Sequence, residues 1–211
     1  MTYASKRYSH ELRLEAATFV AHVTHTSVLT LQMFIACRGF KVLVELLDEE
    51  AQELVYEAVS AISSVFESHT LTTKTDFCRI FAKEGLLEPL SEALTSALKD
   101  NSDEATEVID LSSKICLLFA QVGQNDSVVL NALGTRSILR RLLKACESLC
   151  ESKNMSGLLI TLLKTFKHIS TSAGMLDVLQ NSNAIDVFVR VLDKCKEGER
   201  SSVSLLVLFY I

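Results

Sequence analysis

Apolar side chains recur along this chain three and four residues apart, a spacing that gathers them on one face of an α-helix. The stretch from Ser27 to Asp48, SVLTLQMFIACRGFKVLVELLD, holds one apolar helix, a break at Gly39 and a second apolar helix. The same order of a short helix, a break and a longer helix returns three more times. The pattern therefore predicts an array of helical repeats.

The break residues set the period of this array. They are Gly39, Gly85, Gly134 and Asn183, and they are separated by 46, 49 and 49 residues. Glycine and asparagine readily take the left-handed conformation at a helix end, so we expect that conformation at the breaks. A period in the forties with three helices per unit is typical of armadillo and HEAT arrays. The predicted fold is an all-α, armadillo/HEAT-like right-handed superhelical solenoid of about four three-helix repeats plus a partial one.

One armadillo-like repeat domain is predicted over residues 1–211. Its repeats are expected at residues 7–48, 52–98, 104–150 and 155–195, followed by a partial repeat over 200–211. Such units cannot bury their apolar faces alone, so each must stack on its neighbours. The last residues, VSLLVLFYI, provide no polar cap. This indicates a domain taken from a longer polypeptide, or an end that another chain covers.

The first long helix is predicted over residues 7–23. Five of its apolar residues fall on one face and are expected to be buried: Leu12, Ala16, Phe19, Val20 and Val23. From Ala16 to Cys37 the chain contains no Asp, Glu, Lys or Arg. Threonine and histidine residues interrupt this stretch, so we expect two buried helices joined by a turn and not a membrane span.

Composition narrows the class of protein. One proline and seven glycines in 211 residues favour helices. A net charge of −5 gives no reason to expect nucleic acid or an anionic membrane as a partner. The six cysteines form no C-x-x-C motif and are expected to be reduced core thiols of an intracellular protein.

Two segments of the first half carry a family resemblance. They read RLEAATFVAHVTHTSVLTLQMFIACRGFKVLVELLDEE and DFCRIFAKEGLLEPLSEAL. Together with ALGTRSILRRLLKACESL in the second half, they resemble the armadillo-type region of the fungal septation-initiation and mitotic-exit Ser/Thr kinases. They are also similar to the plant MAP kinase kinase kinase epsilon group. In those plant relatives a long insertion separates the two halves, whereas the join at residues 101–104 is short here.

The resemblance implies a parent polypeptide with an N-terminal kinase domain. It also implies a role in recruiting that kinase to the spindle pole body through a Ras-like small GTPase or a scaffold. This chain itself has no Gly-rich loop and no H-R-D catalytic loop. The D-F-C sequence at residues 76–78 lacks the glycine of D-F-G, so it is interpreted as a helix cap followed by core residues. We therefore predict no catalytic residue.

Candidate partner-binding positions come first from the long helices, which line the groove of armadillo arrays. By register these positions are Thr18, His22, Ser60, Ser64, Lys114, Leu118, Lys164 and His168. The Trp and Asn ladder of peptide-reading armadillo proteins is absent, which argues against main-chain peptide recognition. Ordinary solvated positions are the competing interpretation of each residue.

Arginines supply the remaining candidates. Arg38 and Arg79 lie in the two most specific motifs, where each guanidinium needs a partner. Arg79 can pair with Asp76 on one helix face, and a salt bridge between repeats is favoured over partner contact. Four basic residues form a stripe on one helix: Arg136, Arg140, Arg141 and Lys144. This stripe suits a phosphopeptide or an acidic patch, or is a solvated helix face.

No metal or other cofactor is predicted. His22 with His25, or Cys146 with Cys150, offers two ligands of a metal site, but no third or fourth ligand lies nearby in sequence.

The favoured hypothesis is a non-catalytic protein-interaction domain of a septation and mitotic-exit kinase, located in the cytoplasm and at the spindle pole body. An oligomerisation or autoregulatory module, with a possible homodimer, is the first alternative. An all-helical enzyme is the second, and it predicts a deep polar pocket with convergent titratable groups.

Overall fold

The computed structural model describes residues 2–4, 6–47, 51–68, 72–152, 156–195 and Val203. These residues form helices and no strand, which confirms the predicted all-α fold. A short 3-10 helix, η1 (Thr2–Ala4), precedes twelve α-helices in the described part of the chain. Their bounds are α1 (His10–Thr26), α2 (Val28–Ala36), α3 (Gly39–Leu47), α4 (Gln52–Glu67), α5 (Lys74–Lys83), α6 (Leu87–Ala97), α7 (Asp103–Gly123), α8 (Ser127–Leu133), α9 (Arg136–Glu151), α10 (Ser156–Ser170), α11 (Ala173–Gln180) and α12 (Ala184–Lys194).

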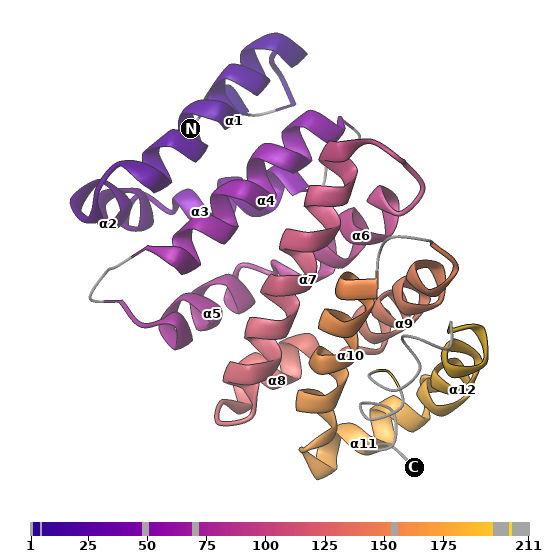
Figure 1. The fold of residues 1–211 in the computed structure, drawn as a ribbon. Coiled ribbons are helices and arrows are strands. Elements are labelled where there is room, and N and C mark those ends of the chain that lie inside the picture. Colours follow the sequence, from indigo (N-terminus) through magenta and orange to yellow (C-terminus); the bar gives the residue numbers. More distant parts are fainter. Residues whose placement is uncertain are drawn as a thin grey trace.

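The helices stack as corresponding members of successive units (Figure 1). The long helices α1, α4, α7 and α10 lie side by side, and each packs on the next. A second layer follows the same rule, with α3 on α6, α6 on α9 and α9 on α12. The residue limits of the individual repeats stay a prediction. The predicted partial repeat over 200–211 lies outside the described residues, apart from Val203.

Helix α4 shows why the apolar pattern predicts interior helices well. It spans Gln52–Glu67, which matches the predicted bounds at both ends. The predicted stripe is buried throughout: Val55, Ala58, Val59, Ile62 and Phe66. Further apolar residues on α4, such as Leu54 and Val65, are buried as well, because α4 packs against both α1 and α7. A helix that is apolar on two sides is typical of an interior position.

A cluster of phenylalanine rings joins the first three units. The Phe40 and Phe81 rings stack with their centroids 4.2 Å apart. Phe66 on α4 approaches Phe81 on α5 at 5.6 Å and Phe119 on α7 at 6.1 Å. Because aromatic side chains bury large apolar areas, this cluster fixes how α3, α4, α5 and α7 pack together.

The predicted burial of the first helix is largely wrong. Of the five predicted residues only Val20 is buried, whereas the exposed fractions of Leu12 and Phe19 are 41% and 68%. The helix also begins at His10 and ends at Thr26, three residues later than predicted at each end. The side that faces α4 carries small residues instead, among them Ala17 and Ala21. The predicted stripe therefore lies mostly on the opposite side of α1.

The left-handed conformation occurs at two of the four predicted breaks. Gly85 has a φ of 77° and Asn183 a φ of 57°. At the first break Arg38 takes this conformation, with a φ of 58°, and Gly39 is the first residue of α3. A Cβ added to Gly39 would lie 2.3 Å from the Phe34 ring. Glycine is needed there for close packing, which corrects its predicted role as a cap.

The third break residue, Gly134, has an ordinary φ of −76°. A Cβ at this position would lie 2.3 Å from Sδ of Met175. Another predicted helix cap is also wrong. Thr73 precedes α5, and its hydroxyl accepts a hydrogen bond from the backbone N–H of Asp76, so Thr73 and not Asp76 of the D-F-C sequence is the cap.

Replacing Gly39 by alanine should destabilise the fold, because the new methyl group would displace the buried Phe34 ring. We expect the free energy of unfolding to fall by about 1–3 kcal/mol, measured by urea denaturation. Gly157→Ala on α10 is the matched control, since nothing lies within 4 Å of its added Cβ. That variant should be neutral or slightly stabilised. Equal stability of both variants would contradict the packing role of Gly39.

Candidate functional site

The outward side of the long helices holds most of the predicted binding positions. His22, Lys114 and Lys164 are exposed. Four others are half-buried: Thr18, Ser60, Leu118 and His168. The Lys114 ammonium donates a hydrogen bond to Asp110 Oδ2 at 2.6 Å on the same helix. Burial, followed by the nearby Lys167, lowers the pKa of His168. The role of these residues in partner binding stays a prediction.

Ser64 does not lie on this outward side. Its side chain is buried, and its hydroxyl contacts that of Thr24 on α1 at 3.1 Å and donates to the Ala61 carbonyl at 2.8 Å. Ser64 therefore fills the interface between α1 and α4. The predicted register was shifted at this position, where Ser60 remains partly accessible and Ser64 does not.

Arg79 lies on α5 and pairs with two carboxylates. One is Asp76 on the same helix, at 3.9 Å, as predicted. The other is Asp126, whose Oδ2 accepts a hydrogen bond from Nε of Arg79. Asp126 precedes α8 and its Oδ1 accepts hydrogen bonds from the backbone N–H groups of Val128 and Val129, at 3.0 and 3.2 Å. The guanidinium thus bridges α5 to the beginning of α8 in the next unit.

The electrostatics of Asp126 follow from these bonds. Burial disfavours its charged form, but the hydrogen bonds from Arg79 and the two backbone N–H groups favour it and lower its pKa overall. Asp126 is therefore a buried, ionised carboxylate that connects neighbouring units. Arg38, the other candidate arginine, lies in the turn after α2 and is exposed.

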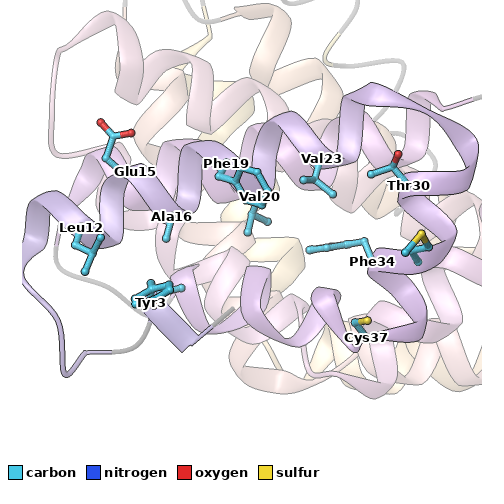
Figure 2. A pocket seen from close by; sticks show the side chains of 12 residues that line it. Tyr3, Leu12, Glu15, Ala16, Phe19, Val20, Val23, Thr30, Phe34 and Cys37 are labelled. Atoms are coloured by element: carbon cyan, nitrogen blue, oxygen red, sulfur yellow. The ribbon is translucent and has the colours of Figure 1, made fainter.

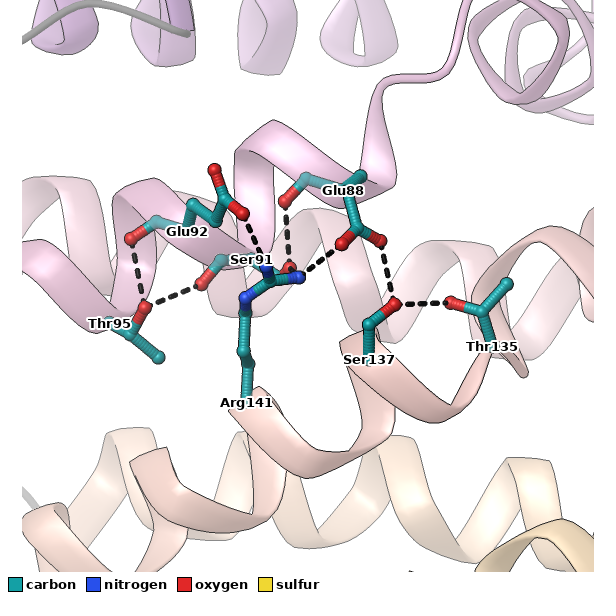
Figure 3. A network of polar contacts seen from close by, with 7 residues as sticks. All are labelled: Glu88, Ser91, Glu92, Thr95, Thr135, Ser137 and Arg141. Atoms are coloured by element: carbon teal, nitrogen blue, oxygen red, sulfur yellow. Dashed lines mark hydrogen bonds and ion pairs between the residues drawn. The ribbon is translucent and has the colours of Figure 1, made fainter.

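Part of the basic stripe on α9 makes contacts within the molecule. Figure 3 shows Arg141 reaching across to α6, where Nη1 donates to Glu88 Oε1 at 2.5 Å and Nη2 pairs with Glu92. The hydroxyl of Ser137 donates to Glu88 at 2.9 Å. The hydrogen bond from Arg141 is the main cause that lowers the pKa of Glu88. Arg141 therefore holds two helices together, while Arg140 is exposed on the same helix.

An apolar groove between α1 and α2 was not predicted from the sequence. It has a cavity volume of about 580 Å³ and is drawn in Figure 2. Its lining is Tyr3, Ala4, Leu12, Glu15, Ala16, Phe19, Val20, Val23, Thr30, Met33, Phe34 and Cys37. Glu15 is the one charged residue in this lining. The uncharged stretch from Ala16 to Cys37 is the sequence signal that points to this surface.

The walls of the groove are mainly apolar, which differs from the deep polar pocket that the enzyme alternative predicts. Among the described residues no group of three or more His, Cys, Asp or Glu side chains is placed to hold a metal ion. Burial raises the pKa of the Cys78 and Cys116 thiols to about 12, so neither is a ready nucleophile. Cys37 is exposed in the groove, which corrects its predicted place in the core.

None of the described helices combines the length and the apolar character that a membrane span requires.

Comparisons with known proteins give the chain its relatives. No family model matches it. Cytokinesis protein sepH of Aspergillus terreus is 40% identical over 193 residues, which cover 90% of this chain and 14% of sepH. The chain is a homologue of part of sepH. Cell division control protein 7 of Schizosaccharomyces pombe is 28% identical over 100% of this chain and 20% of its own length.

The predicted plant resemblance is also confirmed. MAP3K epsilon protein kinase 2 of Arabidopsis thaliana is 40% identical over 116 residues, which cover 54% of this chain and 8% of the kinase. The chain thus spans a small share of the length of each of these relatives.

A solved structure confirms the armadillo-type architecture. The armadillo repeats only protein from Plasmodium falciparum matches with a TM-score of 0.63, covering 95% of this chain and 80% of that protein. The sequence identity is 16%, so this likeness concerns the fold alone. The predicted armadillo-like solenoid is therefore confirmed.

Proposed function

We propose that the chain is the non-catalytic protein-interaction region of a Ser/Thr protein kinase that acts in septation and mitotic exit. It recruits this kinase to the spindle pole body from the cytoplasm by binding a Ras-like small GTPase or a scaffold protein. The observation that carries the proposal is the match to a cytokinesis protein over 90% of the chain. The name of the Arabidopsis relative supports a kinase as the parent polypeptide.

The outward side of α7 and α10 is the proposed contact surface. These two helices pack directly on each other, and they expose Lys114 and Lys164. The Asp110 carboxylate already pairs with Lys114, so Lys164 offers the more available positive charge, and the neighbouring His168 adds a hydrogen-bonding imidazole. Basic groups at the edge of an interface attract an acidic partner surface and raise the rate of association.

A binding experiment with charge reversal tests this proposal. The 211-residue chain is titrated with the Ras-like small GTPase of the cytokinesis machinery, loaded with GDP or with a non-hydrolysable GTP analogue. We expect the Lys164→Glu and His168→Glu double variant to bind about tenfold more weakly. Lys99→Glu, an exposed residue beyond α6, is the matched control and should bind normally. Absence of binding in both nucleotide states would contradict the GTPase as partner.

A further inference from the structure

Helix α1 carries apolar side chains on two opposite sides, although it has a long-helix neighbour on one side in the described structure. Ala17 and Ala21 are buried toward α4. Leu12 and Phe19 face the groove and are exposed. Helices α4 and α7 are also apolar on both sides, and each of them lies between two long helices. Helix α1 therefore has the residue pattern of an interior helix of the array.

The shape of the groove suits the binding of one helix. On α1 its wall is formed by Leu12, Ala16, Phe19 and Val23, which lie at positions i, i+4, i+7 and i+11. This spacing keeps them in one row along about 16 Å of the helix axis. The opposite wall is α2, where the exposed fraction of Met33 is 62%. Figure 2 shows the Phe34 ring pointing into the space between the two walls.

Exposed aromatic and methionine side chains in one contiguous patch are unusual on a protein surface and mark interaction sites. We propose that this groove binds a single amphipathic α-helix of a partner protein, which lies along α1 as α1 itself lies along α4. The helix inserts apolar side chains from positions i, i+3 or i+4, and i+7 between Phe19 and Met33. This contact uses a different side of the array from the proposed GTPase surface and does not depend on it.

Charge adds a second requirement on the partner helix. Glu15 is the charged residue of the lining, and Glu11 lies one turn before it on α1. Both are exposed, so the acidic edge of the groove consists of Glu15 in the lining and Glu11 beside it on α1. The partner helix therefore carries lysine or arginine beside its apolar stripe. Such rim contacts select the partner more than they add affinity.

Two synthetic helical peptides test this inference. Both have about 18 residues and the same leucine stripe, and they differ in having lysine or glutamate on the flanks. Binding to the 211-residue chain is measured by fluorescence anisotropy. We expect micromolar binding of the lysine peptide, and binding of the glutamate peptide that is about threefold to tenfold weaker at low salt. This preference should shrink as salt is added.

Variants show whether the groove is the site. Phe19→Asp should weaken binding of the lysine peptide at least tenfold, because it places a charge at the centre of the apolar contact. Ile185→Asp on α12 is the matched control, since Ile185 is also exposed, at 48%, and the same charge is added. Both variants should melt within about 2 °C of the wild type because both positions are exposed. Lys164→Glu with His168→Glu should leave peptide binding unchanged, which separates this site from the GTPase surface.

Three results would overturn the inference. The first is equal binding of the lysine peptide by the wild type and by Phe19→Asp. The second is a concentration-dependent dimer in sedimentation that Phe19→Asp abolishes, which would make a second copy of the chain the occupant. The third is co-sedimentation with phosphatidylcholine vesicles that Phe19→Asp abolishes, which would make a lipid surface the occupant.

Discussion

Replacing Phe66 by alanine should lower the free energy of unfolding by about 3–5 kcal/mol, the range for a large buried ring lost from a packed core. Its ring is buried and lies 6.3 Å from Phe77, 5.6 Å from Phe81 and 6.1 Å from Phe119. These rings come from α5 and α7, so the cavity would loosen two interfaces of α4 at once. The measurement is the midpoint of urea unfolding, followed by circular dichroism.

The control for Phe66→Ala is the same substitution at an exposed phenylalanine. Phe19→Ala on α1 removes a side chain that is 68% exposed, so stability should change by about 0.5 kcal/mol or less. Similar midpoints for the two variants would show that the phenylalanine cluster does not hold these units together.

Replacing Asp126 by alanine should lower the free energy of unfolding by about 2–4 kcal/mol, from the lost helix cap and the lost charged hydrogen bond. The substitution leaves the N–H groups of Val128 and Val129 without their acceptor. It also removes the carboxylate that links Arg79 to α8. Asp126→Asn is the matched variant, because asparagine also caps helices but carries no charge. It should lose only part of this stability.

The stabilities of the wild type and of Asp126→Asn should depend differently on pH, because the pKa of Asp126 is lowered in the folded protein. A carboxylate whose pKa is lower in the folded state stabilises the fold above its unfolded pKa of about 3.9, and this stabilisation is lost as the pH falls through the folded pKa. The stability difference between the wild type and Asp126→Asn should therefore be largest near neutral pH and shrink below about pH 4. A stability difference that stays constant down to pH 2 would contradict an ionised Asp126 carboxylate in the folded protein.

Interior helices could be predicted from the sequence because both of their sides are apolar, so any chosen stripe is buried. Helix α4 is the clearest case. At the edge of the array the same reasoning failed, because in the described structure α1 packs against a long helix on one side only, and periodicity does not say which of its two apolar sides that helix covers. The order and approximate bounds of the helices follow from local signals, whereas burial at the edge depends on stacking.

Contacts between units were harder to predict than contacts within a helix. The pairing of Arg79 with Asp76 follows from their spacing of three residues, but Asp126 lies 47 residues away and becomes a neighbour only through stacking. The same applies to Arg141, a candidate in the basic stripe, whose contact with Glu88 on α6 also arises only through stacking. The uncharged stretch from Ala16 to Cys37 was interpreted as two buried helices. The structure shows that one side of this stretch is exposed, which the sequence pattern did not indicate.

Amide hydrogen exchange of the chain, alone and with the GTP-loaded small GTPase, tests the proposed binding role most directly. The account predicts slower exchange in α7 and α10 when the GTPase is present, and unchanged exchange in α12. Unchanged exchange throughout the long helices, at GTPase concentrations well above the expected dissociation constant, would contradict it.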